Sequence, residues 1–329
     1  MKKGIVILFA ATLGLAACNN YKKGEGGLMY QIHKDGGKDK IKTGDIVKLN
    51  FVQKNERDSV MFSTYDIEQA QVFPVGKKEY GGDMNDVLFL FGEGDSATFK
   101  LNLDTMAKRT GQPKPPTALK DTYLVFTVKV EKVLTKNANE ADTTFQRRAQ
   151  DFFQKDYLAT VAKLKDGEAG KIKTYVSDNN LKPQATASGL QYVISAPGNA
   201  ERPVQGDTIM LNYTGKLLTK KANGKESIFD TSVEKIARDA GIINPMAKYG
   251  PRAFVMGSAI PGFEEGYQLV GKGGKVLCII PSKLGYGEGG EPRAKISPYS
   301  PLAFEIEVVD IKKPGAPVTA AVPAAPVKK

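Results

Sequence analysis

Apolar and polar residues alternate with a period of two in several short segments of the C-terminal half of the chain. Three such segments are 209–213, 276–280 and 302–308. This period is typical of strands with one buried face, so they predict an antiparallel sheet. Pro261 and the acidic Glu264 and Glu265 are typical of a first helical turn, and Gly271 can end that helix. The pattern predicts an α+β domain, in which a sheet packs on one short helix.

A period of three and four replaces this alternation in the middle of the chain. The apolar positions from 143 to 165 are Phe145, Ala149, Phe152, Phe153, Tyr157, Val161 and Leu164. Their spacing predicts an amphipathic helix, and a second, shorter helix is expected over 171–179. The apolar face either packs on a neighbouring domain or forms the seam of a dimer, and the sequence leaves both open.

The chain also contains an internal repeat. Residues 27–51 match residues 189–213 at one constant offset and without a gap. Further matches join 73–76 to 254–257, 92–94 to 271–273, and 124–128 to 302–306. A chain of 329 residues is long enough for two cores. We therefore predict two copies of one domain, 27–135 and 186–313, joined by a helical linker over 136–185.

The N-terminus has the pattern of a targeting segment. Lys2 and Lys3 precede an apolar stretch over 5–15, which is too short to span a bilayer and predicts a signal peptide over 1–17. The following Leu-Ala-Ala-Cys tetrad resembles the lipobox of bacterial lipoproteins, which implies that Cys18 carries lipid. The alternative is a plain signal peptide with a chance cysteine. We expect a tether over 18–26, an anchor in the cell envelope, on the periplasmic side of the outer membrane, and a disordered Pro/Ala-rich tail over 314–329.

Composition narrows the chemistry. One His and two Cys leave too few ligands for a Cys/His metal site, so no metal or cofactor is expected. The net charge of +11 comes from basic residues dispersed among acidic ones, which does not favour nucleic-acid binding. If Cys18 is lipidated, Cys278 is the single thiol of the mature chain. Its place in an alternating segment indicates a buried strand residue rather than a reactive one.

The second copy carries a set of motifs in a fixed order. They are Tyr-Thr-Gly at 213–215, Phe-Asp-Thr-Ser at 229–232, Val-Met-Gly at 255–257, Ile-Pro-Gly-Phe-Glu-Glu-Gly at 260–266, Leu-Gly-Tyr-Gly at 284–287 and Ser-Pro-Leu-Ala-Phe at 300–304. In this order they resemble the FKBP-type peptidyl-prolyl cis-trans isomerases over about 189–312. The resemblance implies a sheet wrapped on a short helix, an aromatic pocket for a prolyl ring, proline-containing polypeptides as clients, and tacrolimus-like inhibitors.

The resemblance also implies the site residues. The catalytic set is Tyr213, Asp230 and Tyr286, and the substrate-binding set is Phe229, Ala259, Ile260, Phe263 and Phe304. Rotation of a prolyl amide needs no covalent intermediate, since an apolar pocket that binds the twisted amide better than the planar one is sufficient in principle. Tyr286 is expected to donate a hydrogen bond to the substrate carbonyl, and Tyr213 to position Asp230. Taken singly, the aromatic residues fit an ordinary core and Asp230 fits the start of a turn.

The first copy lacks these polar groups, which predicts a non-catalytic domain with the same fold. The replacements are Phe51 for Tyr213, Phe62 and Ser63 for Phe229 and Asp230, Met84 for Phe263 and Ala107 for Tyr286. Such a copy would bind chains or hold the enzyme away from the membrane. The whole chain is therefore expected to be an envelope isomerase that assists folding of exported proteins. The alternative is a non-catalytic chaperone or scaffold that uses both copies as polypeptide-binding modules.

The second copy departs from the family pattern at one place. Residues 233–250 form an insertion in which we expect a helix over 233–240, capped by Ser232. Arg252 stands where the family usually has an aromatic residue of the pocket wall. The insertion either replaces this wall or narrows the choice of substrate.

Overall fold

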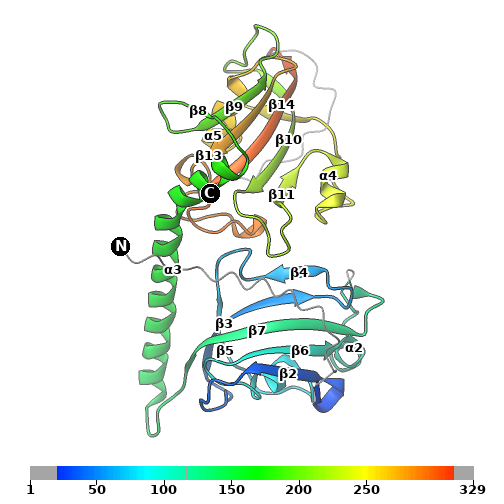
Figure 1. Ribbon diagram of the computed structural model, residues 1–329, viewed down its shortest axis with the longest axis vertical. Helices are drawn as coiled ribbons and strands as arrows, with labels where there is room; N and C mark the ends of the chain where they lie inside the picture. Colours follow the sequence, from blue (N-terminus) through cyan, green and yellow to red (C-terminus); the bar gives the residue numbers. More distant parts are fainter. Residues whose placement is uncertain (1–20, 116–117, 315–329) are drawn as a thin grey trace.

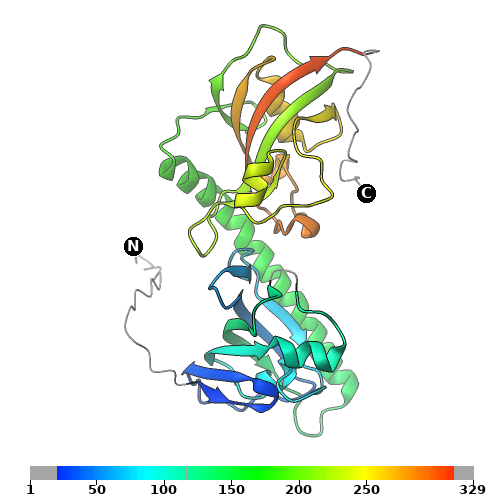
Figure 2. The same ribbon diagram turned by 90° about the vertical axis from the view of Figure 1, so that its right-hand side faces the viewer.

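The computed structural model describes residues 21–115 and 118–314, which form two sheets and a long helix. The sheets follow each other along the long axis of the molecule, and helix α3 (Asp142–Asp178) runs past both of them (Figures 1 and 2). The signal peptide, Cys18 and nearly all of the C-terminal tail lie outside the described residues. Within residues 21–115 and 118–314, no helix has the length and apolar character that a membrane span requires.

The first sheet is antiparallel and has the strand order β1-β2-β6-β7-β3-β4, with β5 also paired to β3. Its strands are β1 (Lys22–Lys23), β2 (Met29–Lys34), β3 (Ile46–Lys54), β4 (Val60–Ser63), β5 (Gln71–Pro74), β6 (Ser96–Asn102) and β7 (Tyr123–Leu134). The described part of this copy also contains helices α1 (Met84–Leu88) and α2 (Leu103–Thr110) and the 3-10 turn η1 (Glu25–Gly27).

The second sheet repeats this topology with the order β11-β10-β14-β13-β9-β8, and β12 also pairs with β10. Its strands are β8 (Gln184–Ala185), β9 (Gln191–Ala196), β10 (Thr208–Leu217), β11 (Ser227–Thr231), β12 (Arg252–Val255), β13 (Lys275–Ile280) and β14 (Leu302–Lys312). Its helices are α4 (Glu234–Asp239) and α5 (Pro261–Gln268), with 3-10 turns η3 (Ser282–Leu284) and η4 (Pro292–Ala294). The predicted α+β class and the two matching copies are confirmed.

Each copy buries one face of its sheet around its own apolar core. In the second copy the core joins strands β10, β13 and β14 to helix α5, through residues such as Leu211, Ile280 and Tyr267. Helix α5 approaches β13 closely, because a Cβ atom at Gly266 would lie 2.3 Å from Sγ of Cys278. This contact fixes the helix under the sheet and places its first turn beside the strands that carry the candidate site.

Helix α3 is continuous, so the prediction of two separate helices in the linker is wrong. Gly167 and Gly170 lie inside it, and each costs about 1 kcal/mol relative to alanine, which weakens a helix without ending it. Burial of Val161, Leu164 and Tyr175 within the chain offsets this cost. Other apolar residues of the same helix, Phe153, Tyr157 and Leu158, are exposed.

Two further local predictions are wrong. Helix α4 begins at Glu234 and its N-cap is Val233, so Ser232 does not cap it. The Ser232 hydroxyl instead accepts a hydrogen bond from the Tyr213 amide at 2.9 Å, which ties the insertion to β10. In the first copy, Ala107 lies in helix α2 rather than in a loop like that of Tyr286, because Asn102 caps a helix directly after β6.

Candidate active site

The polar centre of the site is a hydrogen bond between two neighbouring strands. Tyr213 lies on β10 and is buried, whereas the side chain of Asp230, on β11, is about half exposed. The Tyr213 hydroxyl donates to Oδ2 of Asp230 at 2.6 Å, a distance typical of an O–H donor on a charged acceptor. The structure thus brings together two of the three predicted catalytic residues, Tyr213 and Asp230.

Arg252 joins this pair from strand β12. Because β12 pairs with β10 in the register Leu211 to Arg252, the arginine begins its strand beside Tyr213. Its Nη1 donates to the Tyr213 hydroxyl at 2.7 Å and lies 3.8 Å from Oδ2 of Asp230. Sequence reasoning noted Arg252 only as a missing aromatic and did not predict this contact. The signal in the sequence was only that a basic residue replaces an aromatic one at position 252.

An aromatic cluster lies next to these polar groups. Phe263 of α5 contacts both Tyr213 and Phe304, with ring centroids 5.6 and 5.0 Å apart and nearly perpendicular planes. Phe229 contacts Phe304 in the same geometry at 5.6 Å. Phe254 of β12 also belongs to the cluster, 5.2 Å from Phe263, although the sequence suggested only a core role for it. Edge-to-face packing of this kind fixes ring orientation and adds to the energy of burial.

Gly215 leaves the space that two of these rings occupy. On β10 it pairs with Phe304 of β14 on one side and with Asp230 of β11 on the other. A Cβ atom at this position would lie 2.6 Å from the Phe304 ring and 2.8 Å from the Phe229 ring. The rings can therefore meet only over a glycine. The last residue of the Tyr-Thr-Gly motif must be glycine because any side chain there would collide with the two rings.

The segment that leads into helix α5 contains two of the predicted substrate-binding residues, Ala259 and Ile260. The Glu264 carboxylate accepts hydrogen bonds from the amides of Gly257 and Ala259, both at 2.8 Å. Ile260 is the N-cap residue, and Pro261 opens the helix as expected. Ala259 and Ile260 are partly buried against the core that contains Phe263. Glu264 therefore holds the segment that leads into the helix.

Tyr286 lies in the turn that follows η3 and packs partly buried against the same core. Burial raises the pKa of Tyr286, and the nearby negative charges of Glu291 and Asp230 raise it further. Burial, with the charge of Asp230, also raises the pKa of Tyr213 well above its usual value. Both phenols keep their protons at neutral pH. In the described part of the chain no hydrogen bond engages the Tyr286 hydroxyl, so it is available as a donor.

Cys278 is a core residue. It is fully buried in β13, and burial raises the pKa of its thiol to about 12. A thiol with so high a pKa is a poor nucleophile at neutral pH. Within residues 21–115 and 118–314 no three His, Cys, Asp or Glu side chains are grouped as a metal site would require.

The first copy keeps the aromatic part of the site and loses the polar part. Phe51 contacts Phe62 and Phe126, with ring centroids 5.3 and 6.0 Å apart. The position of Arg252 is taken by Gln71, which pairs with Leu49 as Arg252 pairs with Leu211. This copy therefore offers an apolar cluster but no hydroxyl held between a carboxylate and a guanidinium.

The second copy is an antiparallel sheet packed on the short helix α5, with aromatic rings between them, which is an FKBP-like fold. Residues 199–309 match the model of the FKBP-type peptidyl-prolyl cis-trans isomerase family. Over these residues the chain is similar to that family, as the motifs of the second copy predicted.

Curated relatives share this region. A probable FKBP-type peptidyl-prolyl cis-trans isomerase of Haemophilus influenzae is 37% identical over 153 residues, 46% of this chain and 54% of that protein. The probable isomerase FkpA of Neisseria meningitidis is 32% identical over 196 residues, 58% of this chain and 65% of its own length. The chain thus spans between half and two thirds of these relatives.

Two solved structures are also among the proteins that match this chain. The crystal structure of FkpA from Escherichia coli matches with a TM-score of 0.40 and 28% identity, over 54% of this chain and 76% of that chain. The three FKBP domains of wheat FKBP73 match with a TM-score of 0.30 and 17% identity, over 88% of this chain and 96% of that chain.

Proposed function

We propose that the second copy catalyses cis-trans isomerisation of Xaa-Pro bonds in polypeptide clients. The observation that carries this proposal is the hydroxyl of Tyr213, held between Asp230 and Arg252 at the edge of the aromatic cluster. A cluster that served only as a core would have no use for these polar groups. The first copy, which lacks them, has an intact core.

The mechanism follows from the physics of the amide. The barrier to rotation is about 20 kcal/mol because the planar amide has partial double-bond character. A prolyl ring bound against Phe229, Phe263 and Phe304 leaves water, and the less polar twisted amide loses less on desolvation than the planar one. Ala259 and Ile260 border this surface. Tyr286 donates a hydrogen bond to the substrate carbonyl, and Asp230 is oriented by Tyr213 without transferring a proton.

The test is the rate of cis-to-trans conversion of a short Xaa-Pro peptide with the whole chain. We expect acceleration that tacrolimus abolishes. Substitution Tyr286→Phe removes one hydrogen bond in the transition state and should lower kcat/KM about tenfold. Tyr192→Phe is the matched control, because its hydroxyl bonds to Gln184 on the far edge of the sheet. A folded chain that gives no acceleration would overturn the proposal.

We also propose that the chain works in the cell envelope as a lipid-anchored folding helper, on the periplasmic side of the outer membrane. The basic start, the apolar stretch over 5–15 and the cysteine at 18 support this proposal. We expect the wild-type protein in the membrane fraction, labelled by a fatty-acid probe. Cys18→Ala should release it and remove the label. An unlabelled, freely released wild type would contradict the anchor.

A second candidate function is polypeptide binding without turnover. The apolar cluster of the first copy, Phe51 with Phe62 and Phe126, favours it for that copy. If both copies only bind, substitution of Asp230 and Tyr286 should leave client affinity unchanged and there should be no turnover to lose.

A further inference from the structure

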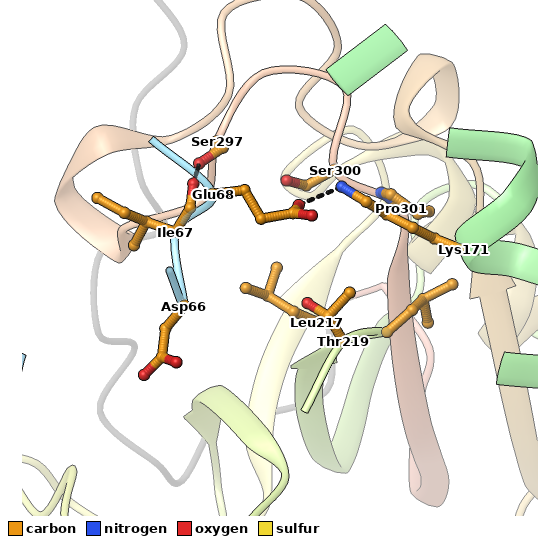
Figure 3. A pocket seen from close by; sticks show the side chains of 10 residues that line it. Asp66, Ile67, Glu68, Lys171, Leu217, Thr219, Ser297, Ser300 and Pro301 are labelled. Carbon is orange, nitrogen blue, oxygen red and sulfur yellow. Dashed lines mark hydrogen bonds and ion pairs between the residues drawn. The ribbon is translucent and has the colours of Figure 1, made fainter. Parts of the chain in front are cut away.

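The first copy touches the second one close to the candidate active site. A turn over residues 64–68, which follows β4, lies against the loop over residues 282–300, which contains Tyr286; we call these the 64–68 turn and the Tyr286 loop (Figure 3). The Ser297 hydroxyl donates to the Ile67 carbonyl at 2.6 Å, and Ser297 is buried. The Ala222 amide donates to the Asp66 carboxylate at 2.8 Å, and the Glu68 carboxylate pairs with Lys171 of α3.

The space enclosed by this contact is very small. A cavity of about 10 Å³ lies between the 64–68 turn, α3 and the second sheet, and is lined by residues such as Glu68, Lys171 and Leu217. A volume of this size holds about one water molecule. The contact is therefore a packed junction within the chain rather than a site for a ligand.

Helix α3 holds the start of the Tyr286 loop. The two carboxylate oxygens of Glu168 accept hydrogen bonds from the Ser282 amide at 2.5 Å and from its hydroxyl at 2.8 Å. The Ser282 carbonyl in turn accepts from the amides of Gly285 and Gly287, both at 2.8 Å. These two glycines flank Tyr286. Glu168 thus lies two hydrogen bonds away from the turn that sets the direction of the tyrosine.

The other end of the loop is held in the same way. The Tyr299 amide donates to the Gly287 carbonyl at 2.9 Å, which closes the loop at its base. Nζ of Lys165, on α3, lies 5.5 Å from the centroid of the Tyr299 ring, and Ser297 is bound by the 64–68 turn. Both ends of the loop are therefore anchored on parts of the chain outside the second copy.

We propose that helix α3 and the 64–68 turn form an intramolecular brace that positions Tyr286 for catalysis, with Glu168 as its main positioning residue. This inference rests on the proposed function. A turn with glycine on both sides of Tyr286 has wide conformational freedom of its own. A donor contributes to catalysis only if it is held where the transition state needs it. The brace gives the first copy a role that requires no substrate site in it.

The test uses the full chain and two readouts. Glu168→Ala removes both hydrogen bonds to Ser282. Glu168→Gln keeps a side-chain oxygen that can accept from the Ser282 amide and adds an NH2 group that can donate to the Ser282 hydroxyl. Asp166→Ala is the matched control, because it removes an exposed carboxylate from the same helix. We expect Glu168→Ala to speed amide hydrogen exchange over 283–287 about tenfold and to lower kcat several-fold with little change in KM. Glu168→Gln should recover most of both effects.

Ser297→Ala tests the brace at its second anchor and does not depend on the folding of the first variant. It should speed exchange over 295–299 and lower kcat in the same direction. Exchange and kcat within twofold of wild type in both alanine variants would overturn the brace. A wild type that does not isomerise would overturn the proposed function instead, and the exchange readout would still decide whether the loop is held by Glu168 and Ser297.

Discussion

The hydroxyl of Tyr213 makes two hydrogen bonds of opposite sense, donating to Asp230 and accepting from Arg252. This arrangement leaves Asp230 with a fixed orientation although its side chain is about half exposed. The guanidinium of Arg252 places a positive charge 3.8 Å from the Asp230 carboxylate. At the scale of residues, the site is an apolar surface with one oriented polar edge.

Arg252→Ala tests this polar edge. Loss of the donor to Tyr213 frees the tyrosine and the carboxylate to move, so kcat/KM should fall about tenfold to a hundredfold, since a hydrogen bond to a charged group contributes about 1.5–3 kcal/mol. Arg238→Ala is the control, because Arg238 pairs with Glu234 on the exposed surface of α4. A variant with wild-type kcat/KM would show that Arg252 is only a wall residue.

The raised pKa values of Tyr213 and Tyr286 predict the alkaline behaviour of the enzyme. Burial is the main cause of both shifts, and it disfavours the phenolate. The donor form therefore persists above the ordinary tyrosine pKa of about 10. We expect kcat/KM to lose nothing through tyrosine ionisation between pH 7 and pH 10.

By linkage, the stabilising effect of the neutral phenols is complete below the unfolded pKa and is lost as pH rises towards the folded one. A pH profile of kcat/KM, with circular dichroism at each pH to confirm folding, checks both points. The prediction would be contradicted if kcat/KM fell with an inflection below pH 9 in the wild type and in Tyr192→Phe but not in Tyr286→Phe. That result would mean that the Tyr286 hydroxyl loses its proton below pH 9.

At the scale of elements, the position of α5 under β13 decides whether the site forms. The helix carries Phe263 into the aromatic cluster, and it can approach the strand only because Gly262 and Gly266 lack side chains. A Cβ atom at either would lie within 2.5 Å of a side chain of β13. The two glycines of the motif thus serve packing, in contrast to those of α3.

Gly266→Ala should destabilise the chain by about 1–3 kcal/mol, because the new methyl group forces α5 away from Cys278. Gly170→Ala is a matched change on helix α3, where a Cβ atom meets nothing within 4 Å. It should stabilise the chain by about 0.5–1 kcal/mol through helix propensity. Urea unfolding of both variants measures the difference. Equal effects would mean that α5 does not press on β13.

At the scale of the whole molecule, the two copies share one topology but differ in the residues at the position of the candidate site. Among residues 21–115 and 118–314, only the second copy combines the aromatic cluster with a polar edge and a tyrosine turn. Substitution of both Asp230→Ala and Tyr286→Phe in the full chain should lower kcat/KM by more than the tenfold expected of Tyr286→Phe alone, since the first copy has Ser63 and helix α2 at the corresponding places and cannot compensate. A double variant with near-wild-type kcat/KM would show a second working site and contradict the unequal roles.

Much of this molecule follows from local sequence. The alternating segments became strands, the two copies share one topology, and the motifs of the second copy meet around Tyr213, because strand periodicity and turn residues act over a few positions. The fold and the similarity to the family were therefore predicted correctly. The roles of the site residues are still predictions, to be decided by the variants described above.

Other features depend on contacts between residues far apart in the chain. The continuity of α3 through Gly167 and Gly170 depends on the burial of Val161, Leu164 and Tyr175 in the fold, which the helix propensities of the sequence do not predict. The contact of Arg252 with Tyr213 requires the register of β12 on β10, and the bond between Glu168 and Ser282 requires the two copies to lie on one helix. Such contacts join residues that are far apart in the sequence. They exist only once the tertiary structure has brought the partners together.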